Sequence, residues 1–85
     1  SITYAALLLL FGLTPEEKLA QKQLFERCRA AVLRLPEKQR TALILYVMQD
    51  MTHKQAGEVM GLEESSVRKY VKSALEALRN GDWHE

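Results

Sequence analysis

The stretch from residue 52 to residue 79 contains two helix patterns separated by a short turn, and no other feature restricts the fold as strongly. Thr52 with Gln55 three residues later is the pattern of a capping box at a helix start. Gly61 is a typical residue for ending a helix in left-handed geometry, and the next helix is expected to begin near Glu63. Two helices joined by a short turn that contains glycine predict a helix-turn-helix.

The second helix of this pair has one apolar and one polar face, and it is expected to end at Asn80–Gly81. Its apolar residues share one side at 100° per residue and are expected to pack inward: Val67, Tyr70, Val71, Ala74 and Leu78. Residues 65–79 carry four cations against one anion: Arg68, Lys69, Lys72 and Arg79 against Glu76. This composition favours contact with DNA phosphates, and it is also found on ordinary solvated helix faces.

The first helix of the pair is short and is expected to brace the second. Ala56, Val59 and Met60 follow at i, i+3 and i+4 and are expected to be buried. Glycine in a helix interior costs about 1 kcal/mol relative to alanine. We therefore expect another helix to cross closely at Gly57. His53 is expected to be an exposed residue near the start of this helix.

Two further helix patterns precede the pair. Thr14, Pro15 and two acidic residues predict a helix start, and the residues that follow on one face are Leu24, Cys28, Ala31 and Leu35. Cys28 is expected to be a small core residue. Pro36 separates this helix from a central, largely buried one in "EKQRTALILYVMQD". Since no strand-like alternation appears, the fold class is all-α: a small bundle of four to five helices containing a helix-turn-helix.

The 85 residues are enough for one small domain. We expect an apolar N-terminal segment over 1–13, the helical domain over 14–80 and a tail over 81–85. The apolar run Tyr4–Phe11 is too short for a bilayer, which needs about 20 residues. It is expected either to pack on its own bundle or to fill an apolar groove of a second copy, which would be self-association. Because the chain begins at Ser1, we expect it to be part of a longer protein.

Composition excludes several classes of function. The single cysteine cannot form an intrachain disulfide, and two distant histidines give no metal-ligand spacing, so neither a metal nor a cofactor is expected. No nucleophile–base pattern or pair of carboxylates indicates catalysis. The formal net charge of +1 is low for a protein that binds DNA unaided. A partner is therefore expected to hold this domain near its target.

The segments "LPEKQRTALIL" and "MTHKQAGEVMGLEESSVRKYVKSALEALR" resemble region 4 of bacterial RNA polymerase sigma factors, and the extracytoplasmic-function group in particular. The resemblance covers residues 35–79, and "SSVRKYV" is similar to the iron-uptake subgroup. It implies a bacterial cytoplasmic protein that recognises the promoter −35 element, with the second helix in the major groove. The family usually has Glu-Ile-Ala where this chain has Gln55-Ala56-Gly57, and Ser or Thr where it has Glu63.

Residue roles follow from the resemblance by position. Residues implied to face bases are Glu64, Ser65, Ser66, Arg68 and Lys69. Residues implied to meet phosphates are Arg40, Thr52, Lys54 and Lys72. Glu63 is expected to serve the helix start, where acids are favourable, and Glu64 to accept a hydrogen bond from cytosine N4.

The resemblance also implies protein partners. These are the RNA polymerase core, through the flap of its β subunit, and an anti-sigma factor. Two alternatives stay open: a stand-alone helix-turn-helix regulator that needs no polymerase, and a sigma-like interaction module without a DNA role. Specific DNA binding in the absence of polymerase would favour the first alternative.

Overall fold

The computed structural model describes residues 21–81, which contain four α-helices, one π-helical segment and no strand. The elements are α2 (Gln21–Leu33), α3 (Glu37–Leu43), η1 (Ile44–Met48), α4 (His53–Met60) and α5 (Glu64–Asn80). The expected all-α fold with a helix-turn-helix is therefore confirmed. The expected helix start at Thr14, the segment 1–13 and the tail after Gly81 lie outside the described residues. No helix among residues 21–81 is long and apolar enough to cross a membrane.

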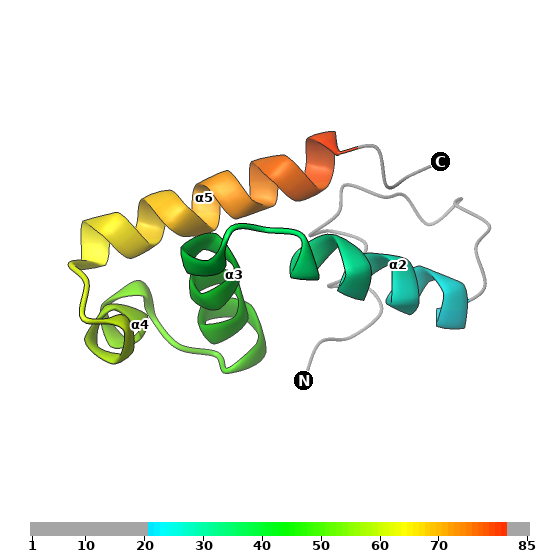
Figure 1. Cartoon of the computed structure of the whole chain (residues 1–85). Helices are drawn as coiled ribbons and strands as arrows, with labels where there is room; N and C mark the ends of the chain where they lie inside the picture. The colour runs from blue at the N-terminus through cyan, green and yellow to red at the C-terminus, as the bar shows by residue number, and fades with distance from the viewer. Residues whose placement is uncertain (1–20, 82–85) are drawn as a thin grey trace.

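The longest helix, α5, organises the fold. It packs against both α3 and α4, with α4 beside its N-terminal end and α3 beneath its middle (Figure 1). The predicted apolar face is confirmed, since its buried residues are Val67, Val71, Ala74 and Leu78. Burying one stripe of α5 leaves the opposite side of this helix available to a partner.

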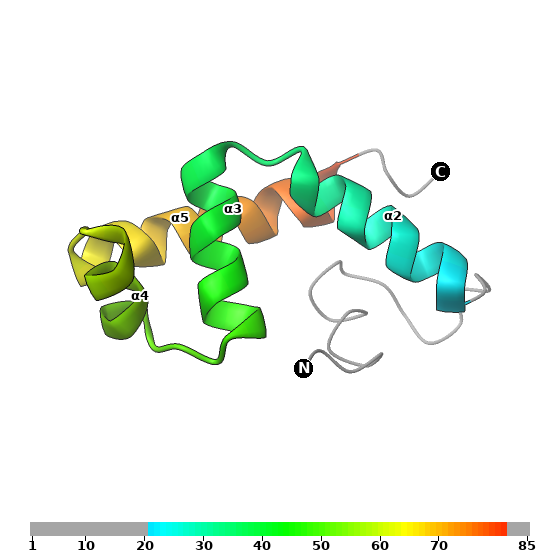
Figure 2. The same cartoon turned by 60° about the horizontal axis from the view of Figure 1, so that its bottom comes forward.

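Helix α2 adds to the same core from the far side of α3 (Figure 2). Cys28 and Ala31 of α2 are buried, as is Leu35 in the turn that follows. Desolvation by burial raises the pKa of the Cys28 thiol from 9.0 to about 11, which keeps the thiol protonated near neutral pH. Cys28 is thus a core residue, as predicted.

Local hydrogen bonds define both ends of α4. The Thr52 backbone N–H donates to Gln55 Oε1 over 2.9 Å, and the Gln55 N–H donates to Thr52 Oγ1 over 3.0 Å. At the other end Gly61 adopts φ 71° and ψ 32°, and the Leu62 N–H donates to the Gly57 carbonyl over 2.8 Å. The capping box and the left-handed glycine are both confirmed.

The buried side of α4 differs from the prediction. Ala56 and Gly57 are buried, whereas Val59 is 61% exposed, so the expected burial of Val59 is wrong. A β-carbon added to Gly57 would lie 2.5 Å from the carbonyl oxygen of Leu62. The close approach at Gly57 is therefore made by the turn between α4 and α5 and not by a crossing helix. Because Ala56 and Gly57 form the buried side of α4, Val59 lies on the side that faces solvent.

The central segment is also different from the expected long, buried helix. The α-helical part ends at Leu43 and continues as a π-helical turn, in which the Gln49 N–H donates to the Ile44 carbonyl over 3.2 Å. A π turn shifts the hydrogen-bond register by one residue and changes the direction of the side chains that follow. Tyr46 and Met48 are consequently 38% and 49% exposed.

Candidate nucleic-acid interface

The exposed side of α5 brings together three of the residues expected to contact DNA. Ser65, Lys69 and Lys72 are exposed, and they lie within about 60° of one another at 100° per residue. Ser66 is half-buried and lies on another side of the helix. The outward surface of α5 therefore carries one hydroxyl and two ammonium groups, which can donate to base edges or phosphates. The exposed carboxylate of Glu76 lies on the same side, between the two lysines in angle.

Glu64 and Arg68 form an ion pair beside this surface. Arg68 Nη2 donates to Glu64 Oε2 over 2.9 Å, and the two side chains are 57% and 48% exposed, respectively. The two residues are one helical turn apart, with the acid N-terminal to the base, which is the favourable order on a helix. Glu64 and Arg68 are each expected to contact a base separately, but in the structure they are paired with each other.

Glu63 occupies the N-cap position of α5 through its backbone. Its carbonyl accepts hydrogen bonds from the N–H groups of Ser66 and Val67, over 3.1 Å and 3.2 Å. Its side chain makes no capping hydrogen bond, so the helix start does not rely on the carboxylate as a cap. The negative charge of Glu63 still lies at the positive end of the helix dipole, where it is favourable.

The start of α4 holds the next two expected phosphate contacts. Thr52 and Lys54 are exposed at this helix end, which carries the partial positive charge of the helix dipole. The first N–H groups of an α-helix have no acceptor within the helix, and the capping box uses that of Gln55. The start of α4 can therefore present backbone donors and the Lys54 ammonium to a phosphate.

Arg40 lies on a different element from the other expected contacts. Its Nη1 donates to the carbonyl oxygens of Leu33 and Leu35, over 3.1 Å and 3.3 Å. These bonds connect α3 to the end of α2 and occupy one nitrogen of the half-buried guanidinium. Arg40 thus has a structural contact, and its role at a phosphate stays a prediction.

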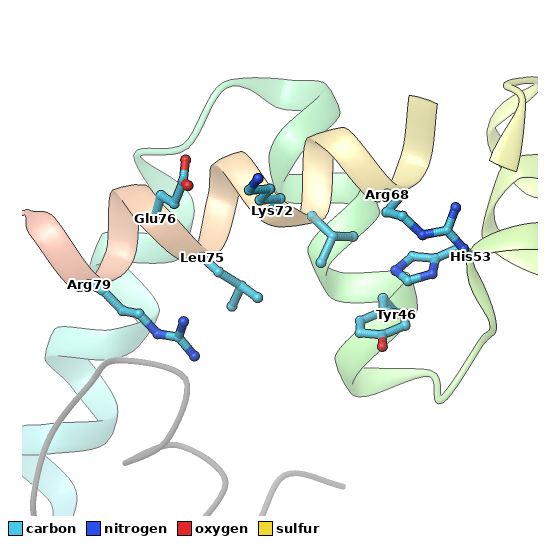
Figure 3. Close-up of a pocket in the computed structure, with 8 residues that line it drawn as sticks. Tyr46, His53, Arg68, Lys72, Leu75, Glu76 and Arg79 are labelled. Carbon is cyan, nitrogen blue, oxygen red and sulfur yellow. The ribbon is translucent and has the colours of Figure 1, made fainter. Parts of the chain in front are cut away.

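A pocket of about 340 Å³ lies between α5, η1 and the start of α4, with Arg68 among its lining residues (Figure 3). Its lining residues are Tyr46, His53, Arg68, Val71, Lys72, Leu75, Glu76 and Arg79. Arg68 and Lys72 belong both to this pocket and to the predicted DNA-facing set. An occupant of the pocket and a bound DNA would therefore meet two of the same cations.

Tyr46 and His53 form a stacked pair at the side of this pocket. Their ring centroids are 4.3 Å apart with an interplanar angle of 9°. His53 is half-buried, so the expectation of an exposed histidine is wrong. The sequence pattern did not predict this pair, which joins Tyr46 of the π-helical segment to His53 at the start of α4.

The exposed donors of this surface are suited to binding. Among residues 21–81, no group of three histidine, cysteine, aspartate or glutamate residues could hold a metal ion. The exposed polar groups on this side of α5 include a hydroxyl, two ammonium groups and the guanidinium of Arg68, together with the carboxylates of Glu64 and Glu76. Such donors recognise phosphates and the acceptor edges of bases.

Comparison with known proteins gives one family. The family model described as "Sigma-70, region 4" matches residues 25–78. No curated protein and no solved structure matches this chain. The matched range contains α3, η1 and α4 completely, together with most of α2 and α5.

Proposed function

Because the chain belongs to the sigma-70 region 4 family, we propose that it recognises the −35 element of promoters as part of an extracytoplasmic-function sigma factor. Sigma-70 region 4 is a family of DNA-binding domains and not of enzymes. The observation that carries the proposal is the exposed side of α5, where Ser65, Lys69 and Lys72 lie together on the second helix of a helix-turn-helix. That helix is the one that enters the major groove in such motifs.

The proposed contacts divide into two groups. Base edges are read from the first two turns of α5 by Glu64, Ser65, Ser66, Arg68 and Lys69. Phosphates are met by Arg40, Thr52, Lys54 and Lys72, which fix the position of the helix on the duplex. The exposure of Lys69 and Lys72 supports these roles, as does the location of Thr52 and Lys54 at the start of α4.

The proposed partners follow from the family and from exposed apolar residues. A sigma factor works with the RNA polymerase core, and we propose the flap of the β subunit as the contact. The exposed Tyr46 and Met48 of η1 support an apolar protein contact. The same proposal includes an anti-sigma partner and self-association through Tyr4–Phe11. It also includes membership of the iron-uptake subgroup and a bacterial cytoplasmic location. Tyr4–Phe11 lies outside the described residues.

Promoter binding with and without core polymerase tests the function. We expect weak binding by the isolated chain, because its formal net charge is only +1. We expect tight, sequence-specific binding when the chain is part of a sigma factor assembled with core polymerase. The measurement is electrophoretic mobility of a promoter duplex, with a duplex of scrambled −35 sequence as the control. Equally tight and specific binding by the chain alone would support a stand-alone regulator instead.

Two lysines of α5 should respond differently to substitution. Lys69→Ala is expected to relax base preference and to cost about 1–3 kcal/mol at the position that it reads. Lys72→Ala is expected to weaken binding to all sequences and to lower the slope of log K against log salt by about one. Binding titrations at several salt concentrations, on matched and mismatched duplexes, measure both quantities.

Lys38→Ala provides the matched control, since Lys38 is an exposed lysine of α3 without a proposed DNA contact. It removes the same charge and should leave base preference and salt slope close to those of the parent chain. If all three variants weakened binding equally, the lysines would act only through net charge, and the assignment of α5 as the reading helix would fail.

A further inference from the structure

The ion pair at the start of α5 couples two side chains that would otherwise meet DNA separately. Glu64 lies in the first turn of α5 and Arg68 lies one turn later. The pair is joined by a single hydrogen bond of 2.9 Å between Arg68 Nη2 and Glu64 Oε2. Both side chains are about half exposed, so the pair remains accessible to a groove.

The donors of Arg68 are sufficient for two partners at once. A guanidinium has five N–H donors, and a bidentate contact with guanine O6 and N7 uses two of them. The bond to Glu64 uses one of the two N–H groups of Nη2. The other N–H of Nη2 remains available and can form a two-donor edge with the neighbouring Nε or Nη1. Arg68 can therefore remain paired with Glu64 while it contacts a guanine.

Pairing also restricts what Arg68 can do in the absence of the correct base. A free arginine has many rotamers and can turn to any nearby phosphate, which adds affinity without sequence information. A carboxylate alone in the groove would be repelled by the phosphates. Joined to each other, the two groups form a unit without net charge. Such an arrangement lowers non-specific attraction and reduces the ordering required for the specific contact.

We infer that Glu64 is a positioning residue, which sets base specificity by holding Arg68 toward a guanine and away from phosphates. The inference rests on the proposed DNA-binding function and changes the role of Glu64 within it. Glu64 then acts through Arg68 and does not read a cytosine of its own. The direct consequence is that substitutions at the two positions must alter the same base position of the binding site.

The test is selection from a duplex library randomised over the site, followed by sequencing of the bound fraction. The proteins are the parent chain, Glu64→Ala, Glu64→Gln, Arg68→Ala and the Glu64→Ala/Arg68→Ala double variant, each assembled with core polymerase. Glu58→Ala is the matched control, because Glu58 is an exposed acid of α4 without a proposed DNA contact, and removing it changes net charge equally. Thermal unfolding of each variant shows that the fold is retained.

Glu64→Ala is expected to lower the preference for guanine at the Arg68 position by about two- to fivefold, since an exposed ion pair contributes little free energy. Its affinity for unrelated DNA should rise, because Arg68 becomes available to phosphates. Glu64→Gln should retain part of the preference through its amide oxygen. In the Arg68→Ala background, Glu64→Ala should have no further effect on base preference.

Three outcomes would overturn the inference. Glu64→Ala could alter a different base position from Arg68→Ala, which would make Glu64 an independent reader. Glu64→Ala could change the base preference equally in the parent chain and in the Arg68→Ala background. It could also leave the base preference of the parent chain unchanged. If the parent chain selects a DNA motif, each of these three outcomes overturns the inference and leaves the proposed function intact. If the parent chain selects no motif, the proposed function fails together with the inference.

Discussion

Leu78→Ala is expected to lower the free energy of unfolding by about 2–5 kcal/mol, the usual range for deleting a buried leucine side chain. Leu78 is 2% exposed and lies in a core whose other members include several alanines and one cysteine. Leu35, Leu43 and Leu78 are the three leucines among the buried residues of the described part of the chain. A small domain has about 5–15 kcal/mol of total stability. The loss of Leu78 should therefore remove a substantial share of the total stability.

Chemical denaturation followed by circular dichroism measures this effect. A loss of 1 kcal/mol corresponds to roughly 4–8 °C in melting temperature for a domain of this size. Leu33→Ala is the matched control, because it removes the same atoms from a side chain that is 52% exposed. It should change stability by less than about 0.5 kcal/mol. Similar losses for both variants would contradict the placement of Leu78 in the core.

Gly57→Ala is expected to destabilise the protein by about 1–3 kcal/mol, the range for overpacking a closely packed position. The new β-carbon would lie 2.5 Å from the Leu62 carbonyl oxygen. That oxygen belongs to the backbone of the turn, and the Leu62 N–H is bonded to the Gly57 carbonyl over 2.8 Å. Neither side can move without disturbing the turn. DNA binding should weaken as well, because the turn sets how α5 is presented next to α4.

This prediction opposes the one from helix propensity, which makes alanine about 1 kcal/mol more favourable than glycine in a helix interior. Val59→Ala, two residues later in α4, is the control, since Val59 is 61% exposed and should be close to neutral. Equilibrium unfolding of both variants in urea provides the comparison. A more stable Gly57→Ala protein would mean that the turn relaxes at little cost and that the contact with Leu62 does not govern this position.

The locally determined features of the fold were predictable from the sequence. The capping box of Thr52 and Gln55 involves residues three positions apart, and the left-handed geometry of Gly61 depends on that residue alone. The apolar stripe of α5 follows from helical periodicity and was confirmed along its length. Glu64 and Arg68 are four residues apart, the spacing at which an acid and a base can pair on a helix, so their ion pair is also a local feature.

Other parts of the candidate site depend on contacts between distant residues. Tyr46 lies in a π-helical segment and stacks on His53 of the next helix, and no spacing rule predicts such a segment. Val59 faces solvent because α4 approaches the turn through Ala56 and Gly57. The sequence pattern identified apolar positions correctly, but it did not indicate which of them would be covered.

By itself, the sequence determined the two helices of the helix-turn-helix, both ends of α4 and the cationic residues of α5, because these features arise from interactions within a few residues. The tertiary structure alone decided which side of α4 is buried, where Arg40 is bonded and how Tyr46 and His53 form one side of a pocket. The physical reason is that burial depends on how closely two backbones approach. At Gly57 the limit is the backbone carbonyl of Leu62. A periodic pattern of apolar side chains contains no information about the position of a backbone carbonyl.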